Sequence, residues 1–247
     1  MSRVLLLSAL VLGCLCGADV CATADLSGPY ALQLSGQSAI SGSPSPAALI
    51  ARLEFDGKTA VTGYSSVNFN GLLLGNPVSG DYALASDCRL TWRLQDDSGA
   101  YQHFAGRVKP GARRVDVRQT DRGADVRGVL EKASDTCRPI DFRGRYVLTL
   151  SGTSTALATG GEPRAVSIEG TANADGAARM AVNTRDLQGE GSFEVDPDCV
   201  VRIGFQAGAG PAVKLRGVLV NGGQTVLAIQ TDPGESVIAR FVASPGR

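Results

Sequence analysis

An internal duplication constrains the fold of this chain more than any other feature. Residues 19–36 (DVCATADLSGPYALQLSG) align without a gap to residues 135–152 (DTCRPIDFRGRYVLTLSG). Later matches keep the same order: Asp56-Gly57 with Asp175-Gly176, Asp87-Cys88 with Asp198-Cys199, and Gln119-Thr120-Asp121 with Gln230-Thr231-Asp232. Ordered matches through a whole unit indicate a repeat. We therefore expect two copies of one domain, over residues 19–134 and 135–247.

The apolar residues within each copy alternate with a period of two. Tyr30, Leu32 and Leu34 share one face of an expected strand, and the second copy repeats this pattern. Turn signals such as Asn70-Gly71 and Asn221-Gly222 separate such runs. We predict an all-β protein of two tandem antiparallel domains with six to eight strands each. Barrels are favoured because closure removes sheet edges, and sandwiches are the alternative.

The first 18 residues have the character of an export signal. Arg3 precedes an apolar stretch that is shorter than a membrane span, and small residues follow. Cleavage after Ala18 is favoured over cleavage after Ala24, because only the former keeps Cys21, which has a counterpart in the second copy. Lipidation at Cys14 is the alternative. We expect an exported, periplasmic or extracellular protein with no transmembrane helix in the mature chain.

Four cysteines remain after cleavage at Ala18, and four cysteines allow three pairings. Each copy carries one early and one late cysteine, so symmetry selects Cys21–Cys88 and Cys137–Cys199. An exported location permits such disulfides. No Cys-x-x-Cys motif supports a metal or redox site.

The composition excludes several classes of function. The chain has 24 basic and 24 acidic residues, which argues against nucleic acid as its main partner. A single histidine, His103, leaves no His-based metal site. Nucleotide-binding and nucleophile-elbow motifs are absent, and we expect no cofactor and no metal. An outer-membrane barrel would need more aromatic residues than the 5% present.

Residues found in only one copy are the candidates for a site, because features kept in both copies serve the fold. We assign no catalytic residue, since His103, a candidate acid or base beside Tyr101, fits an exposed strand position better. Trp92, Tyr64 and Tyr101 are candidates for ligand contact, although Trp92 also fits a core position between Leu90 and Leu94. Asp121 and Asp232 could form paired carboxylates, but their place before a glycine favours hairpin turns.

The repeated unit, Gly-x-Tyr-x-Leu-x-Leu-Ser-Gly followed by Asp-Gly, Gly-x-Tyr with Asp-Cys, and Thr-Asp-x-Gly, resembles a small exported domain of uncharacterised bacterial proteins. That resemblance covers both copies and implies no activity. The strand pattern is also loosely similar to lipocalin-like and allene-oxide-cyclase-like barrels, whose members carry hydrophobic ligands or guide cyclisations. No catalytic residue transfers from them, because fold does not give function.

We expect an exported, non-enzymatic protein that binds a small apolar ligand or a partner on the cell envelope. The alternatives are a cyclase or isomerase of the barrel type, in which His103 or a buried acid assists, and a purely structural envelope protein. A cavity distinguishes them, because an apolar cavity favours a carrier and a filled interior excludes both cavity functions.

Overall fold

The computed structural model describes residues 21–39, 42–108, 113–155, 162–185, 188–206 and 212–245. The expected signal segment, residues 1–18, and the alternative lipidation site Cys14 lie outside these residues. Within the described parts, no helix has the length and apolar character needed to cross a bilayer.

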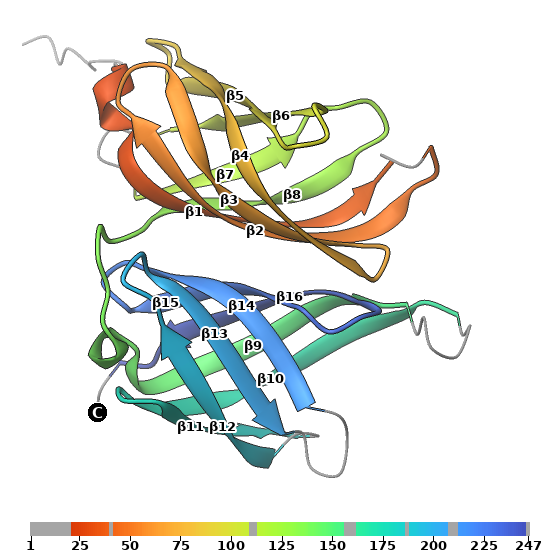
Figure 1. The fold of residues 1–247 in the computed structure, drawn as a ribbon, viewed down its shortest axis with the longest axis vertical. Coiled ribbons are helices and arrows are strands. Elements are labelled where there is room, and N and C mark those ends of the chain that lie inside the picture. The colour runs from red at the N-terminus through yellow and green to blue at the C-terminus, as the bar shows by residue number, and fades with distance from the viewer. Residues whose placement is uncertain are drawn as a thin grey trace, which may run out of the picture.

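The protein consists of two closed, antiparallel, eight-stranded barrels, as predicted (Figure 1). A 3-10 helix, η1 (Thr23–Asp25), precedes the first barrel. That barrel contains β1 (Ser27–Ser38), β2 (Ser45–Asp56), β3 (Ala60–Phe69), β4 (Leu72–Leu84), β5 (Arg89–Gln95), β6 (Tyr101–Arg107), β7 (Arg114–Gln119) and β8 (Asp125–Lys132). Every strand pairs with its neighbour in sequence, and β8 closes the barrel on β1.

The second barrel repeats this order after a second 3-10 helix, η2 (Pro139–Asp141). It contains β9 (Arg143–Ser154), β10 (Arg164–Asp175), β11 (Arg179–Thr184), β12 (Gln188–Val195), β13 (Val200–Gln206), β14 (Ala212–Val220), β15 (Thr225–Gln230) and β16 (Glu235–Ala243). β16 pairs with β9 to close it. The connection between the barrels, residues 133–142, includes the domain boundary expected near Ser134.

The disulfides pair as symmetry predicted, Cys21 with Cys88 and Cys137 with Cys199. Both late cysteines have a left-handed backbone, with φ of 66° at Cys88 and 67° at Cys199. Non-glycine residues seldom adopt this region. The same unusual conformation at equivalent positions shows that the duplication extends to the backbone of the β4–β5 and β12–β13 turns.

The barrel interiors hold the alternating apolar residues that the sequence predicted. Tyr30, Leu32 and Leu34 all point into the first barrel and are at most 3% exposed. At the disulfide end, the ring of Phe55 packs edge-on against Tyr30 and Tyr82, with centroids 5.4 and 5.1 Å apart. Large aromatic side chains therefore fill that end of the first barrel.

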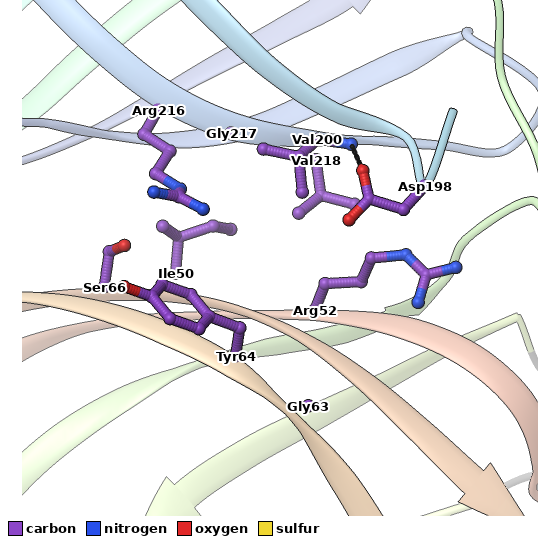
Figure 2. A pocket seen from close by; sticks show the side chains of 10 residues that line it. All are labelled: Ile50, Arg52, Gly63, Tyr64, Ser66, Asp198, Val200, Arg216, Gly217 and Val218. Atoms are coloured by element: carbon purple, nitrogen blue, oxygen red, sulfur yellow. Dashed lines mark hydrogen bonds between the residues drawn. The ribbon is translucent and has the colours of Figure 1, made fainter. Parts of the chain in front are cut away.

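The simple alternation breaks down in β1, where four consecutive residues from Ala31 to Leu34 are buried. The barrels pack against each other through the outer face of β1 and β2 and the outer face of β14, β15 and β16 (Figure 1). Ile50 of β2 faces Val218 of β14 across this interface (Figure 2). Both faces of β1 are therefore covered, one by its own barrel and one by the other.

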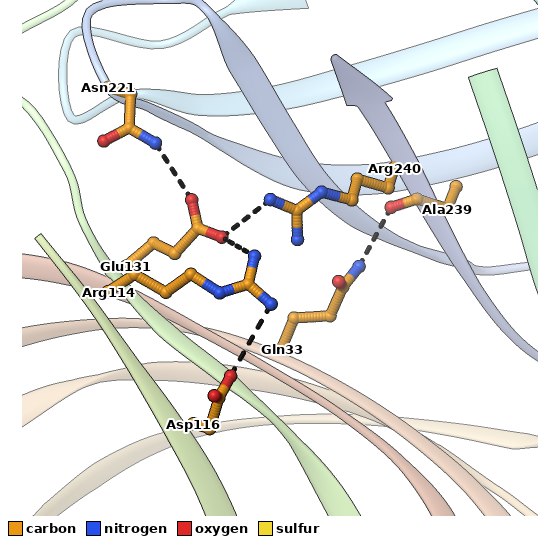
Figure 3. A network of polar contacts seen from close by, with 7 residues as sticks. All are labelled: Gln33, Arg114, Asp116, Glu131, Asn221, Ala239 and Arg240. Carbon is orange, nitrogen blue, oxygen red and sulfur yellow. Dashed lines mark hydrogen bonds and ion pairs between the residues drawn. The ribbon is translucent and has the colours of Figure 1, made fainter. Parts of the chain in front are cut away.

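A polar network also crosses the interface (Figure 3). The Gln33 side chain is buried, and its Nε2 donates hydrogen bonds to the carbonyl oxygens of Ala228 and Ala239, at 2.7 and 2.9 Å. Glu131 of β8, whose side chain is also buried, accepts a hydrogen bond from Asn221 Nδ2 at 2.9 Å. These contacts satisfy polar groups that would otherwise be costly to bury.

Candidate functional site

The open end of the first barrel contains a cavity of about 620 Å³. The loops that end β1, β5 and β7 surround its mouth, so it lies at the end away from the Cys21–Cys88 disulfide. Its walls come from inward-facing side chains of β2 to β5, which are mostly apolar: Leu49, Val67, Val78 and Leu94. Small and medium side chains at this end leave open the space that aromatic rings fill at the other end.

A few polar groups interrupt the apolar wall. Ser38 lines the cavity and is 3% exposed, and its Oγ has no hydrogen-bond partner among the described residues. Ser65 and Asn76 face the same space from β3 and β4. The Ser38 hydroxyl is buried in the wall rather than open to the cavity, so Ser65 and Asn76 are the polar groups that suit a ligand with one polar group of its own.

His103 lies outside this cavity. It stands opposite Arg93 on the outward side of β6, and its side chain is 52% exposed. Its Nδ1 lies 2.7 Å from Oδ1 of Asp121, and its backbone N–H donates to Oδ2 at 2.9 Å. Asp121, unlike His103, lines the rim of the cavity.

The Asp121 carboxylate links the β7–β8 turn to β6 through its contacts with His103. Partial burial works against its charge, but hydrogen bonds from Gln119, from the His103 backbone and from the imidazole hold the pKa of Asp121 below its usual value. Asp232 repeats the arrangement, since it accepts bonds from the Lys214 backbone and from Gln230 at 2.8 and 3.1 Å. The structural interpretation of both aspartates therefore fits the geometry better than an acid–base pair does.

The three aromatic candidates separate in space. Trp92 is buried inside the first barrel, stacked on Phe104 with centroids 5.2 Å apart. Tyr101 lines the cavity mouth, with the Arg93 guanidinium 4.6 Å from its ring centroid. Tyr64 lies on the outside of the barrel, in a groove between the two barrels (Figure 2).

Tyr101 was the one ligand-contact candidate that lines the cavity, and the other lining residues were not predicted. Leu49, Val67 and Val78 have the pattern of ordinary core residues. Ser65 and Asn76 are polar residues at strand positions whose side chains point into the barrel, and they were the one signal of a cavity in the sequence. No cluster of three or more metal-ligating side chains occurs in the described ranges. At the corresponding end of the second barrel, several connecting segments fall outside those ranges.

Comparison with family models, curated proteins and solved structures found no match for this chain. The expected kinship with an exported bacterial domain therefore stays a prediction, and the case for a function depends on the geometry of the molecule.

Proposed function

We propose that this protein is an exported, non-enzymatic binding protein that takes up a small, mainly apolar ligand in the cavity of the first barrel. The observation that carries the proposal is the cavity itself, of about 620 Å³ with apolar walls at the open end of a closed barrel. Ligand pockets commonly measure about 300–1,000 Å³ and combine apolar walls with few polar groups.

The lining favours an uncharged ligand with one polar group. Leu49, Val78 and Leu94 offer surface to an apolar body, and the Asn76 side chain offers a polar contact. The rim carries charges of both signs, including Asp121 and Arg122. A mixed rim does not select strongly for either sign, so an alcohol, ketone or similar neutral compound fits best.

The enzymatic alternative receives less support from the same geometry. A cyclase or isomerase needs an acid or base directed at its substrate. His103 lies outside the cavity, and Asp121 at the rim is engaged in three hydrogen bonds that favour its ionised form. A purely structural role would leave the cavity without a purpose.

Export is supported by the two disulfides, which are consistent with an oxidising compartment. In this proposal the mature protein works in the periplasm or outside the cell, where small apolar compounds need a carrier.

The test uses N-phenyl-1-naphthylamine, a neutral fluorescent probe, together with Trp92, the single tryptophan of the chain. Because Trp92 lies inside the first barrel, energy transfer from it reports binding there. We expect saturable binding to one site. Val67→Phe should fill the cavity and weaken binding at least about tenfold, which corresponds to about 1.4 kcal/mol.

Thr91→Phe is the matched control, because it adds the same ring on the exposed outer face of β5. It should bind the probe as the unmodified protein does, and circular dichroism should show both variants folded. Absence of saturable binding, or full affinity in Val67→Phe, would overturn the proposal. If the probe binds as expected, native mass spectrometry of protein from a bacterial host would identify the natural ligand.

A further inference from the structure

A second open space lies between the barrels, where the β3–β4 hairpin overhangs the outer face of β13 and β14. It is a groove of about 820 Å³, and it adjoins a smaller cleft of about 400 Å³ that shares Tyr64, Ser66 and Arg216 with it (Figure 2). The proposed ligand cavity is a separate space, which meets the groove only at Leu74.

One wall of the groove is apolar and exposed. Leu73, Leu74 and Tyr64 line it and are 45%, 52% and 42% exposed, and Leu72, which adjoins them at the hairpin tip, is 63% exposed. These four make up half of the large exposed hydrophobic residues in the described parts of the chain. Scattered apolar residues on a surface need no explanation, but a contiguous patch marks a binding surface.

The opposite wall is basic. Lys214 and Arg216 alternate along the outward face of β14, and Arg202 stands directly opposite Arg216 in the β13–β14 ladder. Like charges placed opposite each other in a ladder are destabilising. Acidic neighbours compensate only Arg202, whose Nη1 lies 2.9 Å from an Asp196 oxygen and 3.5 Å from a Glu194 oxygen.

Arg216 makes no ion pair with any described residue. Its guanidinium lies over the Tyr64 ring, 4.9 Å from the centroid, which orients the group toward the groove (Figure 2). The Lys214 side chain also forms no ion pair within the described ranges. The remaining acid nearby is Asp198 in the smaller cleft, which accepts a hydrogen bond from the Val200 backbone at 3.3 Å.

We propose that this groove binds a small amphiphilic anion, with its acidic group at Arg216 and Lys214 and its hydrocarbon chain against Leu73 and Leu74. A guanidinium held over an aromatic ring keeps its N–H groups available to a carboxylate. The exposed leucines then bury apolar surface against the chain. Neither wall alone defines this ligand class, but their juxtaposition does.

The groove suits one small molecule better than a segment of another protein. The hairpin tip is fixed to the second barrel, because Gly234 N–H donates to the Gly71 carbonyl at 2.9 Å and Asn68 Nδ2 donates to the Asp232 carbonyl at 3.3 Å. These contacts close the groove toward the β15–β16 turn. A long peptide would need a passage open at both ends.

The test compares dodecanoate with dodecanol, which has the same chain without the charge, by isothermal titration calorimetry. We expect dodecanoate to bind one site, and added salt to weaken it. The double variant Lys214→Gln/Arg216→Gln should lose about tenfold or more in affinity. Arg118→Gln removes an exposed charge on the outer face of the first barrel, far from the groove, and should change nothing.

Val67→Phe, which blocks the proposed cavity, should leave dodecanoate binding intact, so that failure of one proposal is distinguishable from failure of the other. Three outcomes would overturn the groove proposal: no binding of dodecanoate, equal binding by the double variant, or loss of binding in Val67→Phe. Binding of an acidic apolar decapeptide in place of dodecanoate would assign the groove to a protein partner instead.

Discussion

Arg240 of the second barrel donates a hydrogen bond to Glu131 of the first, Nη2 to Oε1 at 2.8 Å, where the Glu131 side chain is only 1% exposed (Figure 3). Arg114 donates to the same oxygen at 2.9 Å, and Asn221 donates to the other. The buried carboxylate of Glu131 on β8 thus binds Arg114 of its own barrel and both Asn221 and Arg240 of the other barrel.

Glu131→Ala should therefore destabilise the protein strongly, because it removes the buried acid between the guanidinium groups of Arg114 and Arg240. Removing one partner of a buried ion pair costs about 3–5 kcal/mol of folding free energy. Because Arg114 is half-exposed, we expect a loss at the lower end of this range, about 3 kcal/mol. Urea denaturation measures it. Asp116→Ala is the control, since Asp116 also pairs with Arg114 but is 88% exposed. Equal losses in the two variants would contradict the central role of Glu131.

The two disulfides should contribute about equally to stability. They close loops with sequence separations of 67 and 62 residues, and the chain-entropy model gives roughly 4 kcal/mol for either length. Cys21→Ala/Cys88→Ala and Cys137→Ala/Cys199→Ala should lower the free energy of unfolding to a similar extent in urea titrations. A large difference between these double variants would show that native contacts, rather than loop length, set their effect.

Two equivalent turn aspartates should make the fold sensitive to acid. Backbone N–H groups, that of Lys58 first, lower the pKa of Asp56, and those of Ala177, Arg179 and Ala178 do the same for Asp175. A lowered pKa in the folded state adds stability above the unfolded value of about 4, and this stability is lost as the pH falls through the folded pKa.

Asp56→Asn/Asp175→Asn should therefore melt at a lower temperature than the unmodified protein at pH 7, and the difference should narrow as the pH falls below about 4. Thermal unfolding followed by circular dichroism between pH 7 and pH 2 measures both effects. A difference that stays constant across this range would show that the charge of these carboxylates is unimportant.

Two glycines should resist substitution because strands approach them closely. Gly36 and Gly152 occupy equivalent positions with φ of 149° and 152°, and an added Cβ would overlap the carbonyl oxygens of Asp125 and Ser236. Gly36→Ala and Gly152→Ala should each cost about 1–3 kcal/mol or more. Gly204→Ala is the control, because its Cβ would meet open space. Chemical denaturation that ranks all three variants alike would contradict this explanation.

The sequence predicted the parts of the fold that local patterns determine. The duplication identified equivalent cysteines, and symmetry then gave both pairings without structural data. The inward positions of Tyr30, Leu32 and Leu34 followed from the period of two. These features depend on neighbours in sequence or on comparison of the two copies, which a single chain provides.

The candidate sites depend on how separate elements meet, and a period-two pattern does not contain this information. Tyr64 was a candidate for ligand contact because only one copy has it, but the pattern did not show that its partner Arg216 comes from the other barrel. Likewise, nothing local to Asn76 showed that its side chain would line a cavity. His103 stood out because only one copy has it, and it proved to lie on the outer surface.

The barrels use different faces to contact each other, and this difference limits how far the arrangement can extend. The positions of the first barrel that correspond to Val218, Leu227, Ile229 and Ile238 of the second are Arg107, Asp116, Arg118 and Arg127, all exposed. Glu169 of the second barrel occupies the place of Ile50. A head-to-tail contact between like units would otherwise propagate into a filament. The charges on these two exposed faces instead disfavour the addition of a further barrel through the same contact.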